Sequence, residues 1–313
     1  MVKIIAFDLD GTLYDKHKHI DEDTIHKIIE FEQKGIVVGI VTGRFYEELD
    51  DVIKKLKLKE YKGFVASSNG LEIHDFIDGE MKSFTRLSKN EVKGIVKEAK
   101  KHHLISYVWQ NGGYTMFGVS VMNIIKKIFS IIPLDSHYIK SLQKAKFEKD
   151  VVLNEALYDK VCFAGITIPK FKTSVLKHHP QYRFYDVGKV GTELCKRDVG
   201  KLEAIRYICR KKGVSISSVM AFGDNGNDVE LLASCGYGVA MKNGSAQAKK
   251  VAKYISDYTN NEKGVLRFMN SFYEFVFWMK YWSKKIRIPF KTKKDPVKEK
   301  IKSKDWMGFI SNT

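Results

Sequence analysis

Residues 4–13 read Ile-Ile-Ala-Phe-Asp-Leu-Asp-Gly-Thr-Leu, an apolar run that ends in two carboxylates, Asp8 and Asp10. A short, β-branched run bounded by Gly11 is typical of a buried strand. Parallel strands of α/β folds carry their ligand-binding groups at their carboxyl ends. We therefore expect Asp8 and Asp10 to lie at the mouth of a site.

The spacing of the two carboxylates indicates a kind of chemistry. Carboxylates this close repel each other unless positive charge lies between them, and a hard divalent cation such as Mg²⁺ removes the repulsion. A carboxylate can also attack phosphorus to form an aspartyl phosphate, while a neighbouring carboxylate exchanges protons with the leaving group and water. Asp-x-Asp also occurs in turns and in sugar-transferring enzymes, so other residues are needed to distinguish phosphoryl transfer from these alternatives.

Length and composition indicate a soluble globular protein. The chain has 313 residues, 44% of them hydrophobic, enough for one large or two ordinary domains. Its four cysteines are scattered, without a disulfide or zinc-ligand spacing, so we expect reduced thiols and a cytoplasmic location. No signal peptide and no run of about 18 apolar residues is found, so we expect no transmembrane helix.

The formal net charge of +17 is unevenly distributed. Between Lys280 and Lys304 eleven Lys or Arg face two acidic residues, so this segment supplies +9 (11 − 2) and the remainder +8 (17 − 9). Elsewhere lysines alternate with acidic residues, as over 47–59, which is typical of a solvated face. We expect no nucleic-acid partner, because no helix-turn-helix, zinc-finger or RNA-binding aromatic signature accompanies the charge.

The first third of the chain alternates between strand and helix patterns. Residues 24–34 carry an apolar stripe at helical spacing that also includes Glu32. Residues 36–41 and 63–67 are predicted strands, a helix is expected over 45–56 between them, and a further helix is expected after the second of them. This alternation implies right-handed crossovers and a parallel sheet.

From about residue 76 short strands and helices mix, and the alternation resumes with a helix over 201–212 and a strand over 219–222. The long middle is therefore an insertion. Elements expected within it are 91–102, 107–109, 121–131, 161–166 and 182–187. Those expected after it are strands at 237–241 and 254–255 and a helix over 245–252 that Ser245 caps.

Polar side chains follow four of the predicted strands, namely Asp8 with Asp10, Thr42, Asn69, and Asp224 with Asp228. The ends of parallel strands converge, so these residues can share one site. Each signal alone has a commoner explanation as a turn or a helix cap. Together they describe a cation held by carboxylates, a hydroxyl for a phosphoryl oxygen and a nucleophile, which phosphoryl transfer requires. Lys201, at a helix start, is the candidate for a fixed positive charge.

These residues resemble the four motifs of haloacid dehalogenase-type phosphohydrolases. The motifs are Asp8-Leu-Asp10-Gly-Thr12, Thr42-Gly-Arg44, Lys201 and Gly223-Asp224-Asn-Gly-Asn227-Asp228. Residues 68–70 and 237–265 look like the Cof-like branch, and Leu202 departs from its usual Gly. The resemblance implies an α/β fold with a Rossmann-like parallel-sheet core of residues 1–82 and 189–270, an inserted α/β cap (type IIB) of residues 83–188, and a C-terminal extension of residues 271–313.

The resemblance also implies roles. Asp8 is the expected nucleophile, and Asp10 is the expected general acid and base. Mg²⁺ is expected to bind at Asp8, Asp10, Asp224 and Asp228. The phosphoryl group is expected to bind at Thr42, Lys201 and Asn227, and the rest of the substrate is expected to lie near Gly43 and Asn69. The expected function is Mg²⁺-dependent hydrolysis of a small phosphorylated metabolite. Sugar phosphates, phosphorylated cofactors and other phosphoesters remain compatible, because cap loops vary widely on one scaffold. The oligomeric state remains open.

Two alternatives remain open. A non-catalytic phospho-ligand-binding or regulatory protein could use the same fold, although every motif residue is intact. A signalling receiver domain uses a similar residue set, but the position of Asp8 and Asp10 on the first strand and the large insertion disfavour it.

Residues 271–313 lie beyond the resemblance. Seven aromatic residues, from Phe272 to Trp282, precede the lysine-rich segment. In one interpretation the aromatic helix packs on the core or on a dimer partner, and the basic run is a disordered tail. In the other the aromatic block lies in a bilayer interface and the lysines contact anionic lipid.

Overall fold

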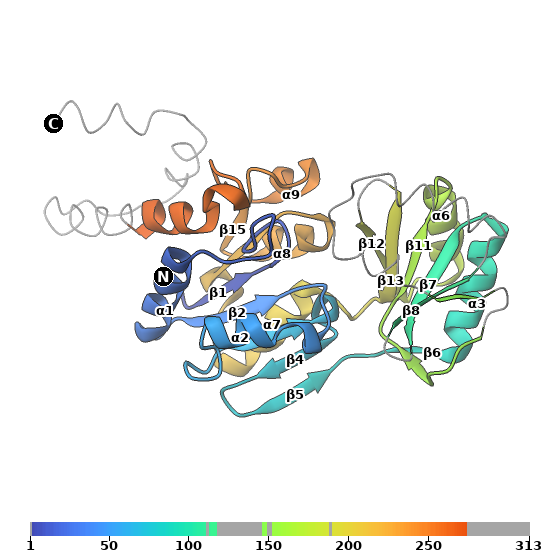
Figure 1. Ribbon diagram of the computed structural model, residues 1–313, viewed down its shortest axis with the longest axis horizontal. Helices are drawn as coiled ribbons and strands as arrows, with labels where there is room; N and C mark the ends of the chain where they lie inside the picture. Colours follow the sequence, from blue (N-terminus) through green and yellow to red (C-terminus); the bar gives the residue numbers. More distant parts are fainter. Residues whose placement is uncertain (1, 111–112, 118–145, 149–151, 188–189, 274–313) are drawn as a thin grey trace, which may run out of the picture. The chain divides into compact units, whose positions relative to one another are not determined.

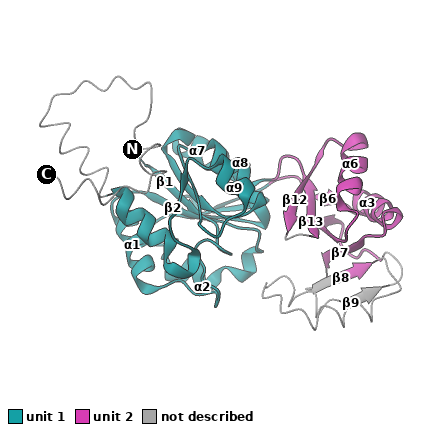
Figure 2. Ribbon diagram, turned by 90° about the horizontal axis from the view of Figure 1, so that it is seen from above, with its two compact units in different colours: residues 1–83, 200–313 teal, residues 84–199 magenta. Residues whose placement is uncertain are grey.

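The computed structural model describes residues 2–110, 113–117, 146–148, 152–187 and 190–273. The chain divides into two compact units, unit 1 with Met1–Ser83 and Gly200–Thr313, and unit 2 with Phe84–Val199 (Figures 1 and 2). Unit 1 is therefore formed by both ends of the chain, and unit 2 by the inserted middle.

Unit 1 is built on an eight-stranded sheet. In spatial order its strands are β16 (Tyr254–Ile255), β15 (Tyr237–Ala240), β14 (Val219–Gly223), β1 (Ile4–Phe7), β2 (Val37–Val41), β3 (Phe64–Ser67), β4 (Glu72–Asp75) and β5 (Glu80–Ser83). The first six are parallel, which confirms the predicted sheet. Phe7 pairs with both Ile40 and Phe222, so β1, β2 and β14 end side by side.

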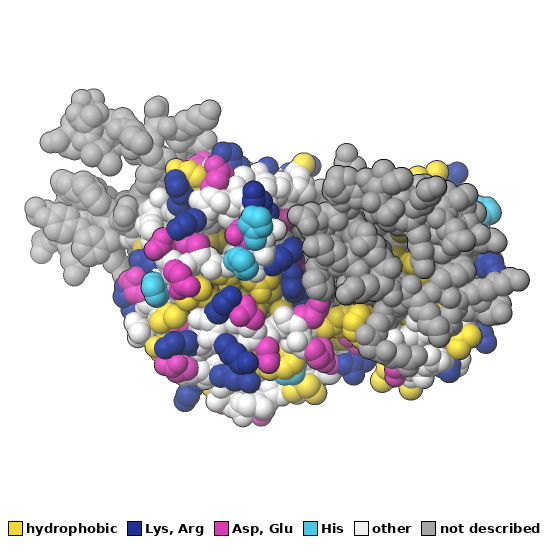
Figure 3. Space-filling view, viewed as in Figure 1, with side chains coloured by type: hydrophobic (Ala, Val, Ile, Leu, Met, Phe, Trp, Pro, Cys, Tyr) yellow, Lys and Arg dark blue, Asp and Glu magenta, His cyan; other side chains and the backbone are white. Residues whose placement is uncertain are grey.

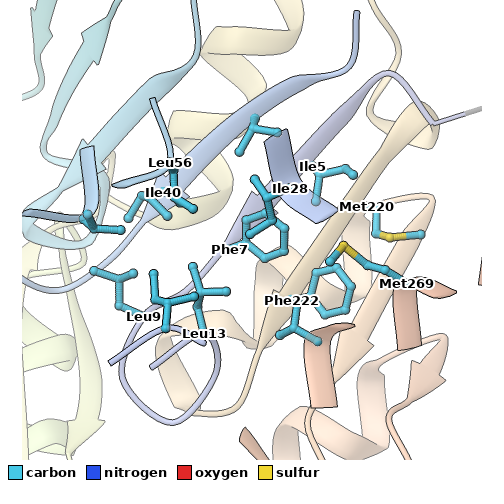
Figure 4. Close-up of a cluster of buried hydrophobic side chains, with 14 of the residues drawn as sticks. Ile5, Phe7, Leu9, Leu13, Ile28, Ile40, Leu56, Met220, Phe222 and Met269 are labelled. Atoms are coloured by element: carbon cyan, nitrogen blue, oxygen red, sulfur yellow. The ribbon is translucent and has the colours of Figure 1, made fainter. Parts of the chain in front are cut away.

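Helices cover both faces of this sheet (Figure 2). They are α1 (Glu22–Gln33), α2 (Asp50–Lys55), α7 (Lys201–Lys212), α8 (Val229–Ser234), α9 (Ala246–Val251) and a helix over residues 264–273. Figure 4 shows the core on the α1 face, where Phe7 and Phe222 stack with ring centroids 5.3 Å apart. Ile28 of α1 and Met269 of the last helix belong to the same buried cluster. The strand that precedes Asp8 is thus held by both neighbouring strands and by helices packed on this face of the sheet.

Two local predictions for unit 1 are wrong. The helix expected over 45–56 is divided at Leu49 into a 3₁₀ turn, Tyr46–Glu48, and the short α2. The Glu48 carboxylate accepts the backbone N–H of Phe45 and so caps the beginning of the 3₁₀ turn. The helix expected after β3 is replaced by the antiparallel hairpin of β4 and β5. Ser68 and Asn69 adopt left-handed φ angles of 47° and 59°, which reverse the chain there.

Unit 2 has a six-stranded sheet and a two-stranded one. The larger contains, in spatial order, β12 (Tyr182–Val187), β13 (Gly191–Lys196), β11 (Val161–Ala164), β7 (Ile105–Gln110), β8 (Gly113–Phe117) and β9 (Lys146–Glu148). The smaller pairs β10 (Leu157–Tyr158) with β6 (Leu87–Ser88). Buried side chains of α3 (Lys89–Lys101) and α6 (Ile168–His178) share one hydrophobic core with the larger sheet.

The boundary of unit 2 differs from the predicted one. The insertion was expected to end at residue 188, whereas the unit continues to Val199. The physical reason is β13, which pairs antiparallel with both β11 and β12 and therefore belongs to the sheet of the insertion. The element expected over 121–131 lies outside the described residues.

The last described residues pack on unit 1. Phe272 is buried and lies among Phe268, Tyr254 and Tyr237, with ring centroids 5.3–6.0 Å away. The ring of Tyr273 lies 4.4 Å from that of Phe31. These contacts agree with the packing interpretation for the first two residues of the aromatic block, while residues 274–313 lie outside the description. Of the helices that the structure describes, none is both long and apolar enough to cross a membrane.

The visible surface of unit 1 carries basic and acidic side chains interspersed (Figure 3). On α2, for example, Lys55 lies 2.9 Å from Asp51 and both side chains are largely exposed. Such pairs contribute little to stability, so this face agrees with the solvated surface expected for residues 47–59.

Candidate active site

Three aspartates meet at the ends of two adjacent strands. Asp8 follows β1, Asp224 follows β14, and Asp228 ends the 3₁₀ turn Gly226–Asp228. One carboxylate oxygen from each lies within 4.8 Å of the others. The backbone N–H of Asp8 donates to the carbonyl of Phe222 at 3.0 Å, which continues the strand pairing into the site. The parallel register therefore joins residues more than two hundred positions apart.

Lys201 supplies a buried positive charge to this cluster. It is the first residue of α7, and its Nζ lies 2.6 Å from Asp8 Oδ1 and 2.7 Å from Asp228 Oδ1. Burial alone would lower the pKa of Lys201, but the carboxylates of Asp228 and Asp8 outweigh this effect and raise the pKa above its usual value. The ammonium is therefore charged and holds the two aspartates at fixed positions.

When all three carboxylates are ionised, one lysine does not balance them, and two negative charges remain (−3 + 1). Burial, with a further contribution from Asp228, raises the pKa of Asp8 to about 7 although Lys201 opposes the shift. Burial and the Asp8 charge raise the pKa of Asp224 as well. Hard oxygen ligands with excess buried negative charge fit a divalent cation such as Mg²⁺. The donor set in this cluster thus agrees with the expected metal.

Asp228 occupies a supporting position within the cluster. Its Oδ1 accepts from Lys201, and its Oδ2 accepts the backbone N–H groups of Asp224 and Asn225, each at 3.0 Å. Because both oxygens are already bonded, Asp228 orients Lys201 and the turn that carries Asp224. Asp8 and Asp224 are better placed to contact a cation directly.

Gly11 and Thr12 fix the side chain of Asp224. Thr12 Oγ1 donates to Asp224 Oδ1 at 3.1 Å. Gly11 has a φ of +82°, and a Cβ there would lie 2.5 Å from Asp224 Oδ2, so only glycine fits. Both residues belong to the motif Asp8-Leu-Asp10-Gly-Thr12, but no contact with Asp224 was predicted for them. Their position immediately after Asp10 was the signal that could have found them.

Asp10 is held by two cationic side chains. Arg44 donates from Nε and Nη2 to the two oxygens of Asp10, each at 2.7 Å, and Lys18 Nζ lies 2.6 Å from Oδ1. The guanidinium also lies 5.1 Å from the centre of the Tyr14 ring. Burial alone would raise the pKa of Asp10, but Arg44 and Lys18 outweigh it and lower the pKa to about 2. Asp10 is therefore ionised in this conformation.

The Arg44 and Lys18 contacts were not predicted. Arg44 belongs to the motif Thr42-Gly-Arg44, but no contact with Asp10 was predicted for it, and Lys18 lies in a polar stretch without periodicity. No pattern in the sequence signals Lys18, because its approach to Asp10 depends on the path of the loop.

The expected phosphate-binding and substrate residues lie close together beside the carboxylates. Thr42 directly follows β2 and is buried, and its carbonyl accepts the backbone N–H of Asn69 at 2.8 Å. Asn227 Nδ2 donates to Asn69 Oδ1 at 2.8 Å. A Cβ at Gly43 would lie 3.1 Å from the same Asn69 oxygen. The structure thus places Thr42, Gly43, Asn69 and Asn227 in one group at the ends of β2, β3 and β14.

The fold and these side chains define an α/β protein with a carboxylate–lysine site at the ends of its parallel strands. The sequence profile of the family described as haloacid dehalogenase-like hydrolase matches residues 5–269. The chain belongs to that family and is a hydrolase, which confirms the resemblance seen in the motifs.

Two curated relatives illustrate the family. The 5-amino-6-(5-phospho-D-ribitylamino)uracil phosphatase YcsE of Bacillus subtilis is 28% identical over 269 residues, which is 85% of this chain and 94% of the relative. The kanosamine-6-phosphate phosphatase of the same organism is 25% identical, over 84% of this chain and 89% of the relative. Both match the chain over nearly their whole lengths.

Solved structures share the fold. A haloacid dehalogenase-like hydrolase from Bacteroides thetaiotaomicron has a TM-score of 0.66 at 22% identity, covering 87% of this chain and 100% of that one. A sugar phosphatase of subclass IIB of the same superfamily has a TM-score of 0.67 at 20% identity, covering 87% and 99%. At this level of identity the likeness extends to the fold alone.

Proposed function

We propose that the protein is a Mg²⁺-dependent phosphatase that hydrolyses a small phosphorylated metabolite through an aspartyl phosphate on Asp8. The observation that carries the proposal is the buried arrangement of Asp8, Lys201 and Asp224, in which one nucleophilic carboxylate lies beside a lysine and a second carboxylate. The names of the two curated relatives, each a phosphatase of a phosphorylated small molecule, support it.

The cation would be held by the side chains of Asp8 and Asp224 and by the backbone carbonyl of Asp10. When bound, it offsets the excess negative charge of the cluster and stabilises charge on phosphoryl oxygens. Asp228 needs no contact with the cation, because its bonds to Lys201 and to the backbone of the 224–225 turn keep the other groups in place.

The phosphoryl group would be bound by Thr42, Lys201 and Asn227, which supply a hydroxyl, an ammonium and an amide as donors. Lys201 also offsets the charge of Asp8, so that a phosphate dianion can approach the attacking carboxylate. Asn69 accepts from the amide of Asn227 and donates its backbone N–H to the Thr42 carbonyl, which would fix the orientation of these two residues, and Gly43 leaves room for the Asn69 side chain.

The reaction would proceed in two displacements. An oxygen of Asp8 attacks phosphorus, the bond from phosphorus to the ester oxygen breaks, and the leaving oxygen takes a proton from Asp10. Water then attacks the aspartyl phosphate and gives a proton to Asp10, which releases phosphate and restores Asp8. The ionised Asp10 seen here suits the second displacement, and the first requires that it leave Arg44 and Lys18 and take up a proton.

We assign the choice of the leaving group to unit 2. All nine residues expected to contact phosphate, metal or substrate lie in unit 1, namely Asp8, Asp10, Thr42, Gly43, Asn69, Lys201, Asn227, Asp224 and Asp228. A cap that contacts the non-phosphate part of the substrate would set specificity without altering the phosphoryl chemistry.

The decisive variant is Asp8→Asn. The amide keeps the shape of the carboxylate but is a poor nucleophile, so we expect loss of turnover on a generic aryl phosphate and on any active member of a phosphometabolite panel, with the fold retained. Beryllium fluoride should bind wild type and not the variant. Asp51→Asn, on the exposed surface of α2, is the matched control.

Turnover by Asp8→Asn at the wild-type rate would rule out the covalent mechanism. Tight phosphate-ester binding by wild type without hydrolysis of any panel member would instead favour the non-catalytic alternative.

A further inference from the structure

A turn outside the four motifs joins the two loops that carry the carboxylates. Asn243, in the turn after β15, donates from Nδ2 to the carbonyl of Gly11 at 2.7 Å. Its Oδ1 accepts the backbone N–H of Asn260 at 3.0 Å, and Asn260 Nδ2 donates to the carbonyl of Tyr14 at 2.7 Å. Two side-chain amides thus hold two carbonyls of the loop that begins at Asp8.

The same turn is bonded to the other carboxylate loop. The backbone N–H of Ser245 donates to the carbonyl of Asp224 at 2.7 Å, and a Cβ at Gly244 would lie 3.1 Å from that carbonyl oxygen. Residues 243–245 therefore bond to Gly11 on one side and to Asp224 on the other. Unlike the contacts between Thr12 and Asp224, this connection passes through neither a carboxylate nor Lys201.

The orientation of the Gly11 carbonyl affects the peptide groups next to the expected cation site. Gly11 has a φ of +82° and directly follows Asp10, whose backbone carbonyl is the third expected contact of the cation. A glycine backbone turns readily, so a bond to its carbonyl restricts the orientation of the adjacent peptide groups. Groups that orient metal ligands from outside contribute strongly to metal affinity, commonly 10- to 100-fold.

From these contacts we propose that Asn243, supported by Asn260, is a positioning residue of the divalent-cation site. Asn243 touches neither phosphate nor cation; it acts by fixing the peptide groups after Asp10 relative to Asp224. The inference rests on the proposed function, because it assumes a cation between Asp8, Asp224 and the Asp10 carbonyl. Asn243 itself is exposed, so its replacement should disturb the core very little.

The test measures Mg²⁺ binding directly. Calorimetric titration of the full chain with MgCl₂ gives the dissociation constant, and the Mg²⁺-dependent rise in Tm gives an independent value. For Asn243→Ala we expect Mg²⁺ affinity to fall about 10-fold or more, with kcat recovered at saturating Mg²⁺. The matched control is Asn261→Ala. Asn261 lies beside Asn260 in the 3₁₀ turn Asn260–Glu262 and accepts the backbone N–H of Lys16 at 2.7 Å, further along the loop. We expect its Mg²⁺ affinity to equal that of wild type.

A folded Asn243→Ala variant that binds Mg²⁺ within about twofold of wild type would overturn the proposal, since a positioning residue should change affinity by more. An equal loss in Asn261→Ala would also overturn it, because the effect would then belong to the loop as a whole. If Asn243→Ala does not fold, Asn260→Ala carries the same test through the bond to Tyr14. A wild-type protein that neither binds nor needs Mg²⁺ would refute the proposed function itself.

Discussion

Glu32 on α1 is a buried carboxylate, 6% exposed, and neither of its oxygens has a hydrogen-bond partner among the described residues. Burial, with a smaller contribution from Glu60, raises the pKa of Glu32 from 4.5 to about 8. We therefore expect it to be protonated in the folded protein at neutral pH. The unfolded chain exposes the same group to water, where it ionises normally.

The sign of the pH dependence follows from this difference. Below pH 4.5 both states hold the proton, so Glu32 contributes no pH dependence to the free energy of unfolding. Between pH 4.5 and about 8 the unfolded state releases the proton and the folded state keeps it, so stability falls as pH rises. At about 1.4 kcal/mol per pH unit, the loss reaches about 3 kcal/mol at pH 7.

The perturbation is Glu32→Gln, which has no proton to release. Urea unfolding of wild type and variant, followed by circular dichroism between pH 4.5 and 7.5, gives the difference in unfolding free energy at each pH. We expect the unfolding free energy of the variant, relative to that of wild type, to increase by about 3 kcal/mol between pH 4.5 and pH 7. Titration of the active-site aspartates is common to both proteins and cancels in the difference.

Glu30→Gln is the matched control. Glu30 lies on the same helix, but Lys27 and Lys34 lower its pKa and its side chain is 41% exposed, so the change in stability should stay within about 0.5 kcal/mol. A stability difference between wild type and Glu32→Gln that is the same at pH 4.5 and pH 7 would refute the reasoning.

Two further predictions concern the cation and the C-terminal segment. Chelation of the metal should abolish turnover, and Ca²⁺ should inhibit the enzyme, because the larger and looser coordination of Ca²⁺ displaces Asp8 relative to phosphorus. Steady-state rates of aryl phosphate hydrolysis with each metal test both expectations. Undiminished turnover without metal would contradict the proposed need for a cation. Ending the chain after Asn270 removes Phe272 and Tyr273 from the core and should lower Tm, since loss of a buried aromatic ring costs about 3–5 kcal/mol. An unchanged Tm together with loss of salt-sensitive binding to anionic vesicles would support the membrane interpretation instead.

The sequence alone determined much of the fold. The helix over 201–212 and the strand over 182–187 have the predicted bounds, and β2, β3, β14 and β15 each differ from the predicted range by one residue. These elements have strong periodicity and clear ends, so local pattern decides them. The convergence of Asp8 with Asp224 was predicted for a related reason, since parallel strands end at one edge of a sheet. Lys201 was a separate candidate, because it lies at a helix start and could supply a positive charge.

Other features were decided only by the tertiary structure. The hairpin after β3 depends on the left-handed backbone of Ser68 and Asn69, and the extent of unit 2 depends on the pairing of β13 with strands far away in the sequence. Neither has a periodic signal. A single local reversal or a long-range pairing outweighs the propensity of the residues that take part.

The contacts around Asp10 and Gly11 show the same limit within the site. Asp10 and Arg44 both belong to the recognised motifs, but the bidentate contact between them joins residues 34 positions apart in the sequence. Asn243 lies 232 positions from Gly11, whose carbonyl accepts its hydrogen bond. Residue type and spacing predict which groups follow which strands. The pairing of a particular donor with a particular acceptor depends on the paths of the loops, which the packing of the whole unit determines. A hydrogen bond tolerates a change of only a few tenths of an ångström in the donor–acceptor distance, and strand order alone does not set atomic positions to that precision.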